Sequence, residues 1–286
     1  MIRLAIFLFV FFVAAPLAAQ EEERPIAIGT THLVEYDAGD VREINVYLPD
    51  GYGESDLRYP VLYLIDGGLD QDFLHVAGTT ALNAMWRRSL PVIVVGIETR
   101  NRQAELLSSK GNAQERKEIP AAGKGIRFRN YIRNVVKPLV ESGYRTDGTD
   151  AVIGESLAGL HIVETWLWEP DLFDKYAAIN PSLWWEDVKL SASASETIAD
   201  GKNRGPLLMS YSNEGPMTTR GVMLVQEAGE KAGLPVCVLA RPDLTHATAY
   251  HLLTPQALQF LFPTDVDFEE EWGFDLPCAK AIEPDA

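Results

Sequence analysis

The sequence predicts an α/β fold in which a doubly wound, mostly parallel sheet follows an antiparallel N-terminal hairpin. Continuous apolar runs at 60–66, 91–97 and 151–154 are typical of strands buried on both faces. From residue 60 onward such runs alternate with helical patterns, which favours parallel strands joined by helices. Before them, two segments of alternating polarity, 32–36 and 43–49, flank the turn Ala38-Gly39-Asp40 and predict the hairpin.

The remaining elements follow in order after the hairpin. Further strands are expected at 176–181, 206–211 and 235–240, and helices within 69–88 and at 128–141, 156–168, 186–199, 219–232 and 255–262. Residues 100–125 are polar and long for a loop in a compact domain, so they are functional or mobile. We find no repeat and no linker, which predicts one domain over 20–286 with an acidic tail from about residue 263.

The N-terminus has the composition of a secretory signal peptide. Arg3 precedes the apolar run Leu4–Val13, and small residues lead to a predicted cleavage after Ala19, giving a signal over residues 1–19. A membrane anchor is the alternative, but the apolar run is short for a span. We therefore expect an exported protein, periplasmic or secreted, with no stable membrane insertion after cleavage.

The net charge and the cysteine content limit the kinds of partner and cofactor that the protein is expected to bind. The net charge of −16 argues against binding to nucleic acid or to anionic membrane surfaces. The two cysteines, Cys237 and Cys278, either form a disulfide or stay unpaired, and neither has metal-ligand spacing with a histidine. No metal or organic cofactor is expected, and the sequence leaves the oligomeric state open.

The stretch Gly154-Glu155-Ser156-Leu157-Ala158-Gly159 places a serine between a buried strand and a helix. A strand, a sharp turn carrying serine and a helix are typical of the nucleophile of an α/β-hydrolase. The simpler interpretation is that Ser156 is an ordinary serine that caps a helix. Ala158 stands where glycine is commoner, but its small side chain should fit. We predict that Ser156 is the nucleophile and that the Leu157 N–H is one oxyanion donor.

The base should follow the last strand, because that is the chain order in this architecture. His32 and His75 precede the serine, and His161 lies on the helix after it, where packing is the expected role. His246 lies in the loop directly after the last strand, whereas His251 lies closer to the following helix, where a structural role is expected. We therefore predict His246 as the base.

The acid should lie between serine and histidine in the chain. Glu214 follows the strand ending near Tyr211 and is the predicted acid, with Asp243 as the alternative. Glu214 could also be an exposed loop carboxylate near a helix start, and a Ser–His dyad without a strong acid is a further possibility.

Other residues are candidates for the walls of the site. Gly68, or next to it Leu69, should supply the second oxyanion donor after the strand at 61–65, although turn glycines would look the same. Trp184 and Trp185 could form an apolar wall for substrate, although at least one is expected in the core. Four arginines flank the long loop and could meet an anionic group or remain solvated: Arg100, Arg102, Arg127 and Arg129.

Several stretches together resemble the esterase D-like family of α/β-hydrolases, also named putative esterases. They are 59–67, 144–146, 154–160, 170–174, 180–185 and 245–247, so the resemblance spans roughly residues 30 to 262. It implies ester hydrolysis or acyl transfer through a serine acyl-enzyme, with Ser156 as nucleophile, His246 as base, and Leu157 and Gly68 as oxyanion donors. Pro181-Ser182-Leu183-Trp184-Trp185 is most similar to the enterochelin and salmochelin esterase branch, which hydrolyses siderophore lactones.

The sequence thus predicts an exported serine esterase acting on a small-molecule ester, siderophore-lactone-like or another. The alternatives are a carbohydrate (acetyl or feruloyl) esterase or an acyltransferase, and, in a different class, a catalytically silent binding protein on the same fold.

Overall fold

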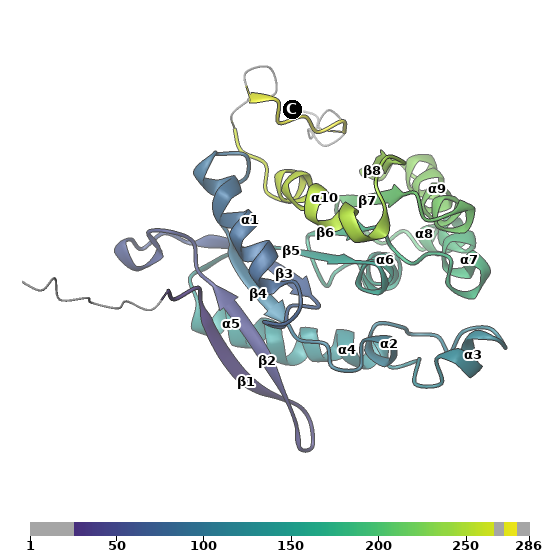
Figure 1. The fold of residues 1–286 in the computed structure, drawn as a ribbon, viewed down its shortest axis with the longest axis horizontal. Coiled ribbons are helices and arrows are strands. Elements are labelled where there is room, and N and C mark those ends of the chain that lie inside the picture. The colour runs from purple at the N-terminus through teal and green to yellow at the C-terminus, as the bar shows by residue number, and fades with distance from the viewer. Residues whose placement is uncertain (1–25, 266–271, 279–286) are drawn as a thin grey trace, which may run out of the picture.

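The computed structural model describes residues 26–265 and 272–278, and the predicted signal peptide and part of the acidic tail lie outside them. Figure 1 shows one twisted sheet with helices on both faces. Its eight strands have the order β1-β2-β4-β3-β5-β6-β7-β8. The bounds are β1 Thr30–Asp37, β2 Asp40–Tyr47, β3 Tyr59–Ile65, β4 Ile93–Ile97, β5 Thr146–Glu155, β6 Lys175–Ile179, β7 Leu207–Ser212 and β8 Val236–Arg241.

The predicted fold class is confirmed. β1 pairs antiparallel with β2, and β2 pairs antiparallel with β4. Every other neighbouring pair is parallel. The central strands are buried throughout, as the continuous apolar runs predicted.

The helices cover the two faces unequally. α1 (Phe73–Met85) and α10 (His246–Leu261) share one face, where they pack on the side that Leu62 and Leu64 of β3 occupy. The opposite face, marked by Val61 and Tyr63, carries a larger set of helical segments. These are α4 (Gly125–Tyr131), the π-helical segment η2 (Ile132–Val136), α5 (Lys137–Gly143), α6 (Leu157–Trp168) and α9 (Pro216–Lys231).

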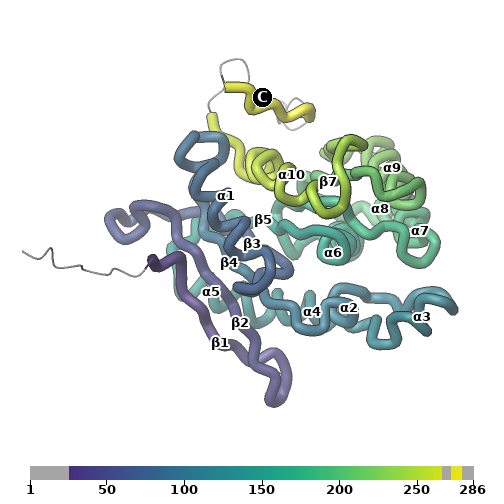
Figure 2. Tube along the Cα trace, viewed as in Figure 1, coloured from purple at the N-terminus to yellow at the C-terminus, as the bar shows by residue number. Residues whose placement is uncertain are grey.

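Short elements connect the rest of the chain. They are η1 (Tyr52–Glu54), α2 (Arg102–Glu105), α3 (Glu115–Glu118), α7 (Trp185–Ala192) and α8 (Ala194–Ile198). The region 100–125, expected to be an irregular loop, contains α2 and α3 and extends along the edge of the molecule in Figure 2. The helix expected over 186–199 is divided at Ser193 into α7 and α8. Within α7, Glu186, Asp187 and Val188 have positive φ angles of 51°, 53° and 60°, so its first turn is irregular.

The prediction for the last helix was wrong about where it begins. α10 starts at His246, not at Pro255, so His246 is the first residue of a helix and not part of a loop. Thr245 and Thr248 form a capping box there. The side-chain oxygen of each threonine accepts a hydrogen bond from the backbone N–H of the other. Proline is common at helix starts, but Pro255 lies inside this helix.

The two cysteines form a disulfide between β8 and the tail, with their Cα atoms 5.7 Å apart. Within 26–265 and 272–278, every helix is too short or too polar to cross a bilayer.

Candidate active site

Ser156 occupies a strained turn between β5 and α6. Its φ of 60° and ψ of −115° lie outside the regions that most residues adopt, so the surrounding structure must hold it there. Two backbone hydrogen bonds to the neighbouring segment do so: Ser156 N–H donates to Ile179 O, and Ser182 N–H donates to Ser156 O, both at 3.0 Å.

The helix approaches the strand closely at this turn. A Cβ at Gly154 would lie 2.7 Å from the Cβ of Ala158, so glycine is required at the first position once alanine fills the second. Ala158, which stands where glycine is commoner, therefore fits at this turn because Gly154 leaves space for its Cβ atom. Leu157 is the first residue of α6, so its N–H has no carbonyl partner within the helix.

Glu214 and His246 meet at the carboxyl ends of β7 and β8. His246 Nδ1 lies 2.9 Å from Glu214 Oε1. This hydrogen bond raises the pKa of His246 above its ordinary 6.5. Burial alone would raise the pKa of Glu214, but hydrogen bonds from His246 and Ser212 outweigh it and lower that pKa. Glu214 is therefore an ionised partner for the imidazole.

Asp243, the alternative acid, lies elsewhere. Its carboxylate is fully engaged with Arg241 at 2.7 and 2.8 Å on the surface. The carboxylate against the imidazole belongs to Glu214.

The serine hydroxyl has a different partner from the imidazole. Ser156 Oγ lies 3.2 Å from Ser182 Oγ, and among the described residues no hydrogen bond joins Ser156 to His246. Ser182 is buried and follows β6, the strand next to β5. The sequence prediction gave Ser182 no role, because its contact with Ser156 depends on how two strand ends meet.

The expected oxyanion loop follows β3. Gly68 N–H donates to the side-chain oxygen of Gln71 at 2.9 Å, and the amide nitrogen of Gln71 donates to Thr99 O at 2.7 Å. The predicted second donor is thus engaged by Gln71 in this structure, and a substrate oxygen would have to displace that side chain.

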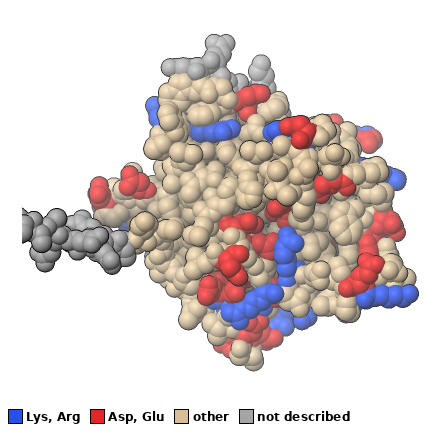
Figure 3. All heavy atoms as spheres, in the orientation of Figure 1, with Lys and Arg blue, Asp and Glu red and all other residues tan. Residues whose placement is uncertain are grey.

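Arg102 joins the loop after β3 to the elbow. Its Nε donates to Asp66 Oδ2 at 2.6 Å and its Nη2 to the Glu155 carbonyl at 3.1 Å. Of the four arginines near the long loop, the other three bond away from this region: Arg100 with Glu98, Arg127 with Asp37, and the buried Arg129 with Glu164 and Glu169. In Figure 3 charges of both signs gather in the lower middle of the face shown, below a broad uncharged area.

Glu155, next to the nucleophile, is the second carboxyl of the site. Burial raises its pKa to about 7. Its Oε1 is buried and has no hydrogen-bond partner among the described residues. The same cause raises the pKa of nearby Asp72 to about 6. Glu155 is mostly neutral below pH 7, whereas Glu214 is charged.

The remaining predicted residues divide between core and surface. Trp185 is buried and donates to Ser109 Oγ at 2.7 Å, so it is a core residue, whereas Trp184 is 39% exposed. His161 is fully buried, and burial lowers its pKa, as expected of a packed residue. His251 packs edge-on against His75, with ring centroids 4.7 Å apart.

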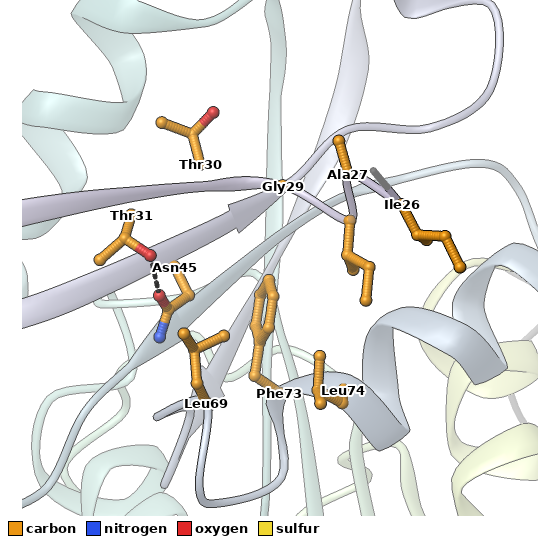
Figure 4. A pocket seen from close by; sticks show the side chains of 10 residues that line it. Ile26, Ala27, Gly29, Thr30, Thr31, Asn45, Leu69, Phe73 and Leu74 are labelled. Atoms are coloured by element: carbon orange, nitrogen blue, oxygen red, sulfur yellow. Dashed lines mark hydrogen bonds between the residues drawn. The ribbon is translucent and has the colours of Figure 1, made fainter. Parts of the chain in front are cut away.

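A cavity of about 250 Å³ lies between the start of β1 and the N-terminal end of α1 (Figure 4). Leu69, Phe73 and Leu74 line it on one side, and Thr31 bonds to Asn45 at its polar end. It does not include Ser156, Glu214 or His246. Within 26–265 and 272–278, no group of three or more His, Cys, Asp or Glu side chains is placed to hold a metal ion.

Known proteins resemble this chain over much of its length. It is 26% identical to an IroE-like serine hydrolase from Shewanella oneidensis, with a TM-score of 0.69 and 78% of this chain and 76% of that one covered. It is 30% identical to the ferri-bacillibactin esterase BesA of Bacillus subtilis over 44% of this chain and 49% of the relative. It is 25% identical to a siderophore triacetylfusarinine C esterase of Aspergillus fumigatus over 52% of this chain and 54% of that protein.

The chain thus spans about half the length of these two curated relatives. The family described as "Putative esterase" matches residues 37–233, which is more than half of the chain. The fold, the elbow and this match agree with the resemblance found in the sequence. The chain belongs to this esterase family and has the α/β-hydrolase fold.

Proposed function

We propose that this protein is a serine esterase in which Ser156 attacks the carbonyl carbon of an ester. The observation that carries the proposal is the 2.9 Å contact between His246 Nδ1 and Glu214 Oε1. It commits one ring nitrogen to the carboxylate and leaves Nε2 as the proton acceptor.

The reaction would proceed in two steps. The Ser156 hydroxyl turns from Ser182 towards His246, gives up its proton to Nε2 and forms a bond to the ester carbon. The imidazolium then protonates the leaving alcohol, and water, deprotonated by the same imidazole, releases the acid from Ser156. Glu214 stabilises the imidazolium, and the N–H of Leu157 is placed to stabilise the oxyanion.

The ester we favour is a siderophore lactone or a similarly small ester. The names of relatives support this choice, since they include esterases of ferri-bacillibactin and of triacetylfusarinine C. We also propose export. N-terminal sequencing of protein recovered outside the cytoplasm should begin at Gln20, and a retained Met1 would contradict it.

Ser156→Ala tests the activity directly. We expect it to abolish hydrolysis of a short p-nitrophenyl ester, a loss of at least about 10⁴-fold, without changing the circular dichroism spectrum. A fluorophosphonate probe should label the wild type at Ser156 and leave the variant unlabelled. Folded wild-type protein that resists the probe would favour the alternative of a catalytically silent binding protein.

A further inference from the structure

Asn180 lies in the loop after β6, the strand between those that lead to Ser156 and to Glu214. It is completely buried and has a φ of 43°. This left-handed conformation costs a residue with a Cβ atom free energy, although asparagine tolerates it better than most. A buried asparagine in this conformation needs an explanation beyond packing.

All the polar atoms of the Asn180 side chain are used. Its Nδ2 donates to Ser212 Oγ at 2.7 Å and also to Glu214 Oε1. Its Oδ1 accepts from Ser210 Oγ at 2.9 Å, and that hydroxyl in turn accepts from the Asn180 N–H at 2.9 Å. The amide is therefore fixed in one orientation, with its NH₂ group towards the carboxylate.

Three donors converge on the same oxygen of Glu214. They are the Asn180 amide, the Ser212 hydroxyl at 2.9 Å and His246 Nδ1 at 2.9 Å. Glu214 follows the end of β7, where the Asn213 N–H donates to Leu244 O and the Glu214 N–H donates to Ser212 O, both at 2.9 Å. These bonds fix the backbone of the turn, whereas the orientation of the carboxylate depends on the three side-chain donors. Without donors from neighbouring strands, the side chain could rotate into water.

We infer that Asn180 is a positioning residue, whose amide holds Glu214 against His246. The inference rests on the proposed function for its catalytic meaning, but the contact itself can be tested without activity. Asn180 would act through Glu214 and not on the substrate.

The backbone and the amide of Asn180 can be separated by substitution. Asn180→Gly removes the amide but suits the positive φ angle, whereas Asn180→Ala removes the amide and keeps the cost of the Cβ atom. Asn83→Ala is a matched control, because Asn83 is also buried and its amide donates to Pro255 O at 2.9 Å, in a contact with no member of the site.

The experiment is an NMR titration of the His246 imidazole, with its signals assigned from their loss in His246→Gln. Three ionisable groups face this ring: Glu214 after β7, Glu155 at the end of β5 and Arg102 in α2. Both Asn180 variants leave the last two in place. We expect the pKa of His246 to fall towards 6.5 in both variants and to stay at the wild-type value in Asn83→Ala.

Kinetics give the second readout. Loss of one hydrogen bond to a charged group should lower kcat by roughly tenfold in both Asn180 variants and leave KM within about twofold. Asn180→Gly should melt at a higher temperature than Asn180→Ala, yet show the same defect. If only Asn180→Gly folds, the pKa of His246 and the kcat of that variant are sufficient to test the role of the amide.

Three results would overturn the inference. They are an unchanged pKa of His246, a pKa that rises because the amide merely competes for Oε1, or a glycine variant that behaves as wild type. A wild type that neither hydrolyses esters nor reacts with the probe would instead refute the proposed function, and the titration would still decide the role of Asn180.

Discussion

Glu214 and Glu155 both place a carboxyl group at a strand end of the same site, yet their pKa values are shifted in opposite directions. Glu214 receives hydrogen bonds from Asn180, Ser212 and His246, and its pKa is lowered. Glu155 is partly buried and its buried Oε1 has no hydrogen-bond partner among the described residues, so its pKa is raised to about 7. The difference teaches that the number of donors, more than proximity to the nucleophile, decides which carboxyl can support an imidazolium.

Removing the charge of Glu214 should have the largest effect. We expect Glu214→Gln to lower kcat by about 10⁴-fold, because an amide cannot hold the imidazole in the reactive tautomer. The residual activity should also extend to lower pH. His246 must be neutral to act as base, and the carboxylate that raises its pKa is gone. The pH profile of kcat/KM measures both effects, and a loss under tenfold would indicate a Ser–His dyad.

Removing the ionisable group of Glu155 should change stability more than catalysis. The folded state holds a proton on Glu155 up to about pH 7, whereas the unfolded chain loses it near 4.5, so this group destabilises the fold as pH rises through that window. Glu155→Gln should therefore be more stable than the wild type at pH 9 by roughly 1–3 kcal/mol and nearly equal to it at pH 4. Urea unfolding at the two pH values measures this, and a pH-independent difference would contradict it.

The smallest effect is expected from Asp243, which is exposed and paired with Arg241. Asp243→Asn should leave kcat and the pH profile within about twofold of wild type, because surface ion pairs contribute little. A loss comparable to that of Glu214→Gln would assign the acid to Asp243 instead.

The sequence predicted the strands well because a buried parallel strand is a local apolar run. It also predicted that Ser156, Glu214 and His246 each follow the end of a strand, and the structure places them after β5, β7 and β8. Their catalytic roles remain predictions. It misplaced the start of α10 at Pro255, because proline is common at helix starts and the capping residue at N3 is threonine instead of glutamate or glutamine. Asn180, Ser182 and Arg102 received no firm role, because their partners come from other strand ends and no local pattern encodes such contacts.

The disulfide between Cys237 and Cys278 closes a loop with a sequence separation of 41 residues, and this loop contains His246 and all of α10. Any single cut by a protease between the two cysteines would leave both pieces joined. A single cut between Cys237 and His246 would therefore not release the segment that carries the proposed base. A nicked enzyme of this kind would run as a single band on a non-reducing gel and as two after reduction.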